Sequence, residues 1–442
     1  MAEETLYPEI TSQRSTRRAE PVFLEDVPDL ARPIEKQLSY WTTLDKPMVL
    51  IVALLLTLGA GMVFSTTFNW SLEDFGSSSA IFTQRHLRNV VLAVIACGLM
   101  ALIDYRFWRR FTPLLYLFTL GALLAVNIFG DDVFSARRAL IGGSLQPGEL
   151  AELISVLYMA SWLGARRTRV DSFVFGLLPF MMLLGIINFP IILQPDISTV
   201  AIIIGTTTAM YFLAGARIWH LLLIVVISAM VGFVVVETQP YAQSRWDSYL
   251  ASLTDPTEAN YHTQQVITAF VTGGWLGKGL GQGTQKFNNA IPAPHTDSIF
   301  AVIGEELGVV GASVVVFLFV AFVMRGFHIA RRAVDPFGSL LAIGLTLLVA
   351  VQALFNIAVM TAVVPTSGLP LPFISYGGSA LLVTMSGVGL MLSVSRVATI
   401  REHSSKRRQD GAVTDRSWGD RRARLSRTSG SRGTPQVRRR RA

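Results

Sequence analysis

Cysteine is almost absent from this 442-residue sequence, and charged residues are scarce. The single cysteine, Cys97, can form neither a disulfide nor a thiolate metal site within one chain. Charged residues make up 15% of the chain, whereas hydrophobic residues make up 51% and the mean hydropathy is +0.47. A soluble domain could not bury so much apolar surface, so the composition indicates a membrane protein.

Ten apolar runs follow one another along the chain, and each approaches the ~20 residues that an α-helix needs to cross a bilayer. We therefore expect an all-α integral membrane protein with ten transmembrane helices in one domain, residues 46–397. The polar residues 1–45 precede a run too long for a cleaved signal, so they are expected to remain as a cytoplasmic segment. The runs lie near residues 47–66, 88–104, 112–129, 150–165, 173–192, 198–215, 218–236, 299–324, 339–362 and 374–395.

Basic residues fall in every second loop between these runs, which sets the predicted orientation. Lys and Arg in short loops are retained on the cytoplasmic side. Both termini are therefore predicted to be cytoplasmic, and residues 237–298 form one long extracytoplasmic loop between helices 7 and 8. The arginines concerned are Arg106, Arg109, Arg110, Arg166, Arg167, Arg169, Arg217, Arg325, Arg331 and Arg332.

The C-terminal segment, residues 398–442, is strongly basic. From Arg401 to Ala442 it holds fourteen Lys or Arg and four Asp or Glu, a net charge of +10 against +8 for the whole chain. This Ser-, Gly- and Arg-rich composition predicts a disordered cytoplasmic tail. A polybasic segment beside a membrane more often binds anionic lipid headgroups than nucleic acid, so anionic lipid is the expected partner and nucleic acid the alternative.

The most informative stretch, residues 291–308, sets three carboxylates at the predicted outer mouth of helix 8. On one continuous helix, Glu305 and Glu306 would lie roughly 12 to 14 Å deeper than Asp297, at ~1.5 Å per residue. An unpaired charge there costs at least ~2.5 kcal/mol, so a partner or a function is expected. Asp297 is placed to act as a general base whose pKa is raised by burial. In the alternative interpretation, Thr296 or Asp297 simply caps the helix.

Three further polar groups lie in or near the predicted outer segments. Arg137 and Arg138 violate the inward bias of basic residues, which favours a role as receptor for a carboxylate or pyrophosphate. The glycines of residues 273–283 permit backbone amides to approach an anion, although a plain turn explains them equally well and no Walker spacing is present. Gln352 and Asn356 lie one turn apart on predicted helix 9, where packing is more common than ligand binding.

Two short outer turns interrupt the apolar runs. In residues 194–196 a proline breaks the helix, and Asp196 is placed to cap the next one at Thr199. The turn at residues 365–379 holds three prolines, three glycines and no charge. Non-helical backbone of this kind persists at membrane depth only where it is buried in protein or lines a cavity.

These motifs resemble those of the SEDS family of bacterial cell-wall polymerases, and they are closer to its division branch (FtsW) than to its elongation branch (RodA). The resemblance covers all ten predicted spans, and the motifs follow one another in the family's order. They are Gln194-Pro-Asp196, Phe212-Leu-Ala-Gly-Ala216, Gly279-Leu-Gly281, Gln285-Lys286, His295-Thr-Asp297, Ile303-Gly-Glu-Glu-Leu-Gly308 and Gly368-Leu-Pro-Leu-Pro-Phe-Ile-Ser-Tyr-Gly-Gly-Ser379.

The resemblance implies an inverting peptidoglycan glycosyltransferase of the bacterial plasma membrane, which polymerises lipid II (undecaprenyl-pyrophosphate-linked disaccharide peptide) into glycan strands. It implies Asp297 as the catalytic carboxylate. The implied partners are a class B penicillin-binding transpeptidase and other division proteins, and the implied location is the division site. A divalent cation, Mg²⁺ or Mn²⁺, is an expected cofactor whose ligands are unknown. The expected substrate-binding residues are Arg137, Arg138, Glu149, Lys286, His295, Thr296, Glu305, Glu306, Ser375 and Tyr376.

The sequence departs from the family's pattern around the predicted substrate mouth. A tryptophan of the outer loop, a lysine of helix 4 and the phenylalanine after the aspartate are replaced. Two alternatives therefore stay open: a transporter (flippase) of a lipid-linked precursor, and a catalytically weak division scaffold. Intramembrane charges at Glu305 and Glu306 would suit transport, although most other predicted helices show almost no midplane charge. The departures include Ser135, Ala139, Glu152 and Ser298.

Overall fold

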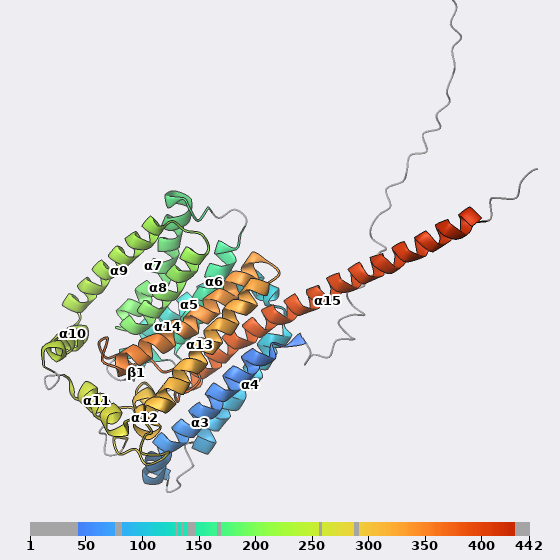
Figure 1. Cartoon of the computed structure of the whole chain (residues 1–442). Coiled ribbons are helices and arrows are strands. Elements are labelled where there is room, and N and C mark those ends of the chain that lie inside the picture. Colours follow the sequence, from blue (N-terminus) through green and yellow to red (C-terminus); the bar gives the residue numbers. More distant parts are fainter. Residues whose placement is uncertain are drawn as a thin grey trace, which may run out of the picture. The chain divides into compact units, whose positions relative to one another are not determined.

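The computed structural model of the chain describes residues 43–75, 82–129, 131–133, 136–139, 146–165, 169–255, 259–286 and 291–428. These residues all belong to one compact unit, Tyr40–Ala442, and are almost entirely helical (Figure 1). Most of the predicted N-terminal segment 1–45 lies outside the described residues, as does the end of the tail, residues 429–442.

Each predicted apolar run corresponds to one helix or to two adjacent helices. Among the described residues, eight helices are long and apolar enough to cross a membrane, and Ile197–Leu213 is a shorter apolar helix. The chain is therefore a multi-pass helical membrane protein, as predicted. The total of ten spans and the side of each terminus remain predictions.

In chain order the elements are α3 (Lys46–Phe75), η2 (Phe82–His86), α4 (Leu87–Leu102), α5 (Tyr105–Phe129), β1 (Asp131–Val133), β2 (Ala136–Ala139), α6 (Pro147–Leu163), η3 (Phe173–Leu177), α7 (Leu178–Leu193), α8 (Ile197–Leu213), α9 (Ile218–Thr238), α10 (Pro240–Thr254), α11 (Tyr261–Gly273), α12 (Ile299–Glu306), α13 (Gly308–Arg332), α14 (Pro336–Met360) and α15 (Gly378–Thr428).

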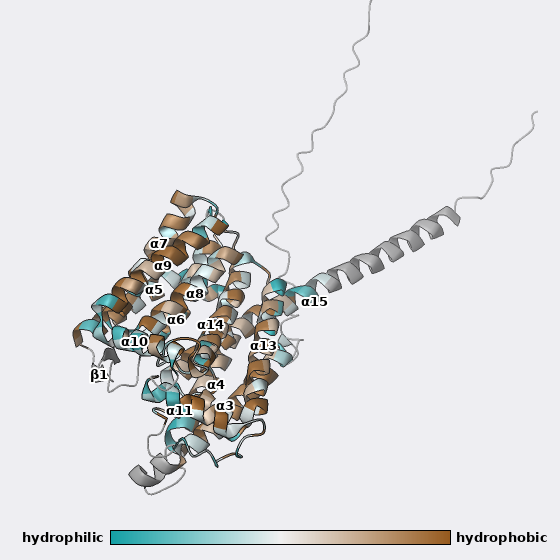
Figure 2. Ribbon diagram, turned by 60° about the vertical axis from the view of Figure 1, so that its left-hand side comes forward, coloured by the Kyte–Doolittle hydropathy of each residue, from teal (hydrophilic) through white to brown (hydrophobic). Residues whose placement is uncertain are grey.

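Helix α14 lies at the centre of the bundle, where it contacts α6, α8, α13 and α15. Helix α6 is buried along most of its length, and its buried residues are mainly aliphatic. Helix α9 is at the periphery: among its residues only His220, Ile224 and Val235 are buried. Its exposed side chains are mostly apolar, as a surface in contact with lipid requires, and the polar Glu237 and Thr238 lie at its end. Figure 2 shows this distribution, with apolar colours along α9 and α13 and hydrophilic colours around α10 and α11.

Two ion pairs connect residues that the charge distribution assigns to the cytoplasmic side. Arg325 on α13 binds Asp45, just before α3, through two contacts of 2.8 Å. Arg106 at the start of α5 donates to Asp335, just before α14, at 2.8 Å. Both pairs join loops that the alternation of basic residues placed on the same side.

The prediction of one continuous helix over residues 299–324 is wrong. The chain ends α12 at Glu306 and starts α13 at Gly308, which has a φ of +67°. A Cβ at Gly308 would lie 2.4 Å from the backbone nitrogen of Gly277, so the break requires glycine. Glu305 and Glu306 therefore end a short helix that precedes α13, and they do not lie inside a spanning helix.

The long segment 237–298, which the loop charges predict to lie outside, contains two helices of its own, α10 and α11, in keeping with its length. Before α6, β1 and β2 form a two-stranded antiparallel ladder, a small departure from a purely helical fold. Helix α12 and the irregular residues 291–298 complete the segment that leads into α13.

The prediction of a wholly disordered tail is also wrong, because α15 continues through Thr428. Residues 398–428 are rich in Arg, a good helix former, and the first proline of the tail is Pro435. Once a helix has started in the bundle, each further residue adds a hydrogen bond without a new nucleation step. Composition alone does not include this effect.

Candidate active site

Asp297 lies in the irregular segment 291–298, directly before α12. Its side chain is half-buried, and burial raises the pKa of the carboxyl group to about 6. A hydrogen bond from Thr296, bonds from nearby backbone amides and the charge of Arg245 act in the opposite direction. The predicted rise of this pKa through burial is therefore confirmed.

The alternative that Thr296 or Asp297 caps the helix is wrong. The N-cap residue of α12 is Ser298, and its side chain makes no capping hydrogen bond. Ser298 Oγ instead donates to the carbonyl of Pro292 at 2.8 Å and lies 2.8 Å from Nε2 of His262. Because the hydroxyl proton goes to that carbonyl, His262 Nε2 is the donor in the second bond.

An amide of α14 holds the backbone of the catalytic candidate. Asn356 Nδ2 donates to the carbonyl of Asp297 at 2.8 Å and to the carbonyl of Leu369 at 2.7 Å. Asn356 is buried, so its two bonds replace water on both carbonyls. The structural interpretation of this amide is confirmed, and the structure adds that Asp297 is the residue it fixes.

Four of the predicted substrate-binding residues meet beside Asp297. Ser375 Oγ donates to the carbonyl of Thr296 at 2.5 Å, and the amide of Tyr376 donates to the carbonyl of His295 at 2.8 Å. The rings of His295 and Tyr376 are edge-on, with centroids 5.6 Å apart. Burial lowers the pKa of His295 to about 4, so its imidazole is neutral at neutral pH.

Arg245 on α10 is a cation of this region that the sequence did not assign to the site. Its Nη1 donates to the carbonyl of Thr366 at 2.8 Å. Burial raises the pKa of Asp297, and the charge of Arg245 opposes that rise. For His262, burial lowers the pKa and the charge of Arg245 lowers it further. A useful signal was present in the sequence, because Arg245 lies in a predicted outer loop against the usual inward bias of arginine.

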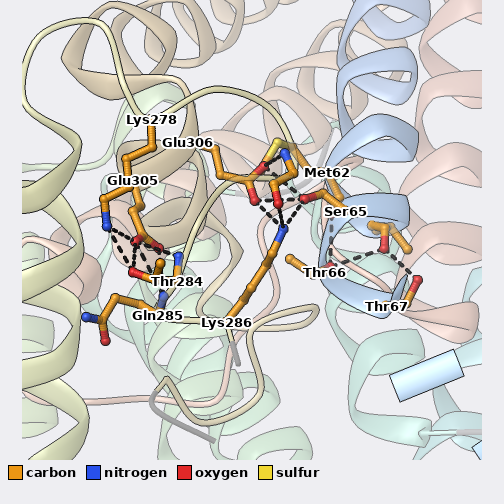
Figure 3. Close-up of polar contacts among 12 residues, drawn as sticks. Met62, Ser65, Thr66, Thr67, Lys278, Thr284, Gln285, Lys286, Glu305 and Glu306 are labelled. Carbon is orange, nitrogen blue, oxygen red and sulfur yellow. Dashed lines mark hydrogen bonds and ion pairs between the residues drawn. The ribbon is translucent and has the colours of Figure 1, made fainter. Parts of the chain in front are cut away.

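Glu305, Glu306 and Lys286 form a second cluster, shown in Figure 3. Lys286 Nζ lies 2.6 Å from Glu306 Oε1, and Ser65 Oγ of α3 donates to the same carboxylate at 2.8 Å. Lys278 Nζ lies 2.7 Å from Glu305 Oε1. Lys286 was expected to bind substrate, but its Nζ donates to Glu306, to Ser65 and to the carbonyl of Gly281 in the glycine-rich loop.

The glycine-rich loop, residues 273–283, wraps this carboxylate pair. The amide of Gly281 donates to Glu306 Oε2 at 3.0 Å, and the next residues, Thr284 and Gln285, donate their amides to Glu305 at 2.8 and 3.1 Å. Burial raises the pKa of Glu305, but Lys278 and these amides outweigh it, so the pKa is lowered. The anion that the glycines approach is thus the chain's own Glu305–Glu306 pair.

A third polar group joins α6, α8 and α14. Glu149 lies in the first turn of α6, and Glu152, one turn later, accepts a short hydrogen bond from Gln352 Nε2 of α14. Asp196 caps α8 by accepting from the amide of Thr199 at 3.4 Å, as predicted. Gln352 therefore packs against a neighbouring helix, in agreement with the prediction.

Arg137 and Arg138 lie in β2, close in sequence to α6. Their side chains fall outside the described part of the structure, so their predicted contact with substrate remains a prediction. Within the described part, no three His, Cys, Asp or Glu side chains converge to hold a metal ion. A divalent cation bound by fewer protein ligands together with substrate phosphates also remains a prediction.

A family model describing the FtsW, RodA and SpoVE cell cycle proteins matches residues 46–400 of the chain. The chain belongs to this family. It is 37% identical over 361 residues to stage V sporulation protein E of Bacillus subtilis, covering 80% of this chain and 98% of that protein. It is also 37% identical over 356 residues to a probable peptidoglycan glycosyltransferase FtsW of Geobacter metallireducens, with 79% and 94% covered.

Two solved structures share the fold of this FtsW/RodA family member. Rod shape determining protein RodA of Thermus thermophilus matches with a TM-score of 0.59 at 23% identity, covering 81% of this chain and 98% of that one. A chain of a peptidoglycan synthase complex that coordinates polymerization and crosslinking matches with a TM-score of 0.65 at 26% identity, covering 80% and 98%.

Proposed function

We propose that this chain is an inverting peptidoglycan glycosyltransferase that polymerises lipid II into glycan strands at the outer face of the plasma membrane. One observation carries the proposal: in a chain of this family, Asp297 is a half-buried carboxyl group with a raised pKa, fixed by Asn356 and followed at once by α12. A carboxylate of this kind is suited to accept a proton near neutral pH.

The chemistry follows from the linkages of substrate and product. Lipid II carries its sugar on an α-linked pyrophosphate, and a β-1,4 product requires inversion at C1. The 4-hydroxyl oxygen of the acceptor forms the new bond to C1 while the bond from C1 to the pyrophosphate oxygen breaks. Asp297 accepts the hydroxyl proton, and the departing undecaprenyl pyrophosphate keeps the electron pair of the broken bond.

The neighbouring residues have defined tasks in this proposal. His295, neutral through burial, and Tyr376 border the site, whereas Arg245 supplies positive charge near Asp297. Arg137 and Arg138 are proposed to stabilise the departing pyrophosphate. No step is assigned to a divalent cation.

Location and partners are supported less directly. The outward position of Asp297 rests on the distribution of arginines in the loops. The septal role, at the division site and with other division proteins, is supported by the name FtsW that relatives carry. A class B penicillin-binding transpeptidase as partner is supported by the match to a chain of a peptidoglycan synthase complex.

The positions of Glu305 and Glu306 weaken the support for the transporter alternative. It relied on Glu305 and Glu306 as charges inside a spanning helix, but both end α12 and are paired with Lys278 and Lys286. The weak-scaffold alternative is decided by activity, because a scaffold needs no general base. A polymerisation assay on purified protein, with and without the transpeptidase, therefore separates the glycosyltransferase from both alternatives.

The experiment is the variant Asp297→Asn, which keeps the size of the side chain and removes its ability to accept a proton. Lipid II polymerisation should fall by ~10²-fold or more, because general base catalysis is lost. Asp45→Asn, the same chemical change at the ion pair with Arg325, serves as the matched control and should retain activity. Polymerisation by Asp297→Asn at the wild-type rate would contradict the proposal.

A further inference from the structure

The segment that carries Asp297 is closed at its base by the second cluster. Lys286 and Glu306 are separated by twenty residues in sequence, yet Nζ and Oε1 lie 2.6 Å apart. The amide of Ile291 also donates to the carbonyl of Gln285 at 2.9 Å. Asp297 therefore lies within a loop whose two ends meet at one buried ion pair.

The polar atoms of this ion pair have several partners each. Both side chains are almost completely buried, with side-chain exposures of 3% for Lys286 and 0% for Glu306. Lys286 Nζ also donates to Ser65 Oγ at 2.8 Å and to the carbonyl of Gly281 at 3.0 Å. Glu306 accepts from Ser65 and from the amide of Gly281. A buried ion pair persists only with such additional bonds, so its geometry is strongly specified.

The cluster also fixes the loop to the rest of the bundle, as Figure 3 shows for Ser65 and Glu306. Ser65 belongs to α3, and Asp45, the residue just before α3, pairs with Arg325 of α13. Two ion-pair clusters thus join α3 to the α12–α13 region, one just before the start of α3 and the other at Ser65. The Asp45–Arg325 pair is therefore a natural control for the loss of an ion pair without disturbance of Asp297.

We infer that Lys286, Glu306 and Ser65 are positioning residues that hold the base of the Asp297 loop. Lys286 and Glu306 were predicted to bind substrate. Their polar atoms instead pair with each other and form hydrogen bonds to the glycine-rich loop. The inference rests on the proposed function, since it concerns the placement of the general base. A small displacement of a catalytic group lowers the rate of the chemical step more than it lowers substrate binding.

The test compares initial rates of lipid II polymerisation by Glu306→Gln, Lys286→Met and the double variant with those of Asp45→Asn and the wild type. Each single variant leaves an isolated buried charge, so we expect kcat to fall by ~10-fold to 100-fold while KM changes less than about twofold. The double variant leaves no isolated charge and should recover the melting temperature, with kcat still at least about fivefold below wild type. Asp45→Asn should lower the melting temperature without loss of kcat.

Three outcomes would overturn the inference. A rise in KM with unchanged kcat in the single variants would show that Lys286 and Glu306 bind substrate. Wild-type kcat in the double variant would show that the closed base is dispensable. An equal loss of kcat in Asp45→Asn would attribute the effect to general stability. The rates of the wild type and of Asp297→Asn test the proposed function separately, because the ion-pair cluster is intact in both proteins.

Discussion

At the scale of single residues, the site balances burial against charge. Asp297 is the clearest case, because burial raises its pKa while Thr296, nearby amides and Arg245 make the rise smaller. The sequence identified Asp297, His295, Thr296, Ser375 and Tyr376 through short motifs, and the structure brings them together. It did not identify Asn356 or His262 as neighbours of that motif, because their contacts join residues far apart in sequence. Nothing in a local pattern specifies which carbonyl a buried amide will find.

The raised pKa of Asp297, about 6, makes a prediction for the pH dependence of activity. A general base works in its ionised form, so kcat/KM should be constant above about pH 7, reach half of its maximum at about pH 6 and fall further below that. His295 has a lowered pKa of about 4 and stays neutral over that range, so it should add no second transition there. Rates of lipid II polymerisation between pH 4.5 and pH 8 would check this, and a profile that stays flat down to pH 5 would contradict it.

The same shift has a consequence for stability. The folded state holds the Asp297 proton more tightly than the unfolded state, whose ordinary value is 3.8. Stability therefore declines as the pH rises from 3.8 to about 6, and the ionised group destabilises the fold at neutral pH by at most about 3 kcal/mol. Asp297→Asn should for this reason unfold at the same or a higher temperature than wild type at pH 7, although its polymerisation rate should be much lower.

At the scale of helices, the sequence predicted correctly which helices exist and in what order, but it missed the boundary between α12 and α13. The apolar run 299–324 is continuous, so hydropathy alone predicts a single helix there. The break depends on Gly308 and on the glycine-rich loop about thirty residues earlier, whose carbonyls at Gly274 and Trp275 accept from the amides of Val309 and Val310. A break specified by contacts between distant segments leaves little local signal.

This break predicts the effect of Gly308→Ala. The residue has a φ of +67°, and a Cβ would lie 2.4 Å from one backbone atom of the glycine-rich loop and 2.5 Å from another. A left-handed conformation and a backbone clash together should destabilise the protein by more than ~1 kcal/mol. Gly61→Ala in α3 is the control, because nothing lies within 4 Å of its added Cβ. Thermal unfolding in detergent should show a large decrease for Gly308→Ala and little change or a small increase for Gly61→Ala; equal melting temperatures would contradict the account of the break.

At the scale of the whole molecule, hydrophobic length and loop charge suffice to predict a multi-pass helical protein, because the bilayer constrains every span in the same way. The bilayer does not constrain the tail in this way. The composition of the tail predicted disorder, whereas α15 continues from the bundle to Thr428. What the composition does retain is charge. The net charge of +10 lies between Arg401 and Ala442, and the first of these residues belong to the helix that continues from the bundle.

The tail's charge makes the last prediction, which separates membrane binding from catalysis. Each Lys or Arg near an anionic leaflet contributes about 1 kcal/mol of attraction, and this attraction weakens as salt rises. A peptide covering Arg401 to Ala442 should therefore bind vesicles that contain anionic lipid, dissociate from them at high salt and fail to bind neutral vesicles. A nucleic-acid duplex added as competitor tests the alternative partner.

The catalytic candidates and the tail are predicted to lie on opposite sides of the bilayer, so a chain shortened to end at Ile400 should polymerise lipid II in detergent at the wild-type rate. Loss of activity in a shortened chain that still unfolds at the wild-type temperature would mean that the tail is coupled to the site of Asp297, and that the division between an outer catalytic side and an inner anchoring side is wrong.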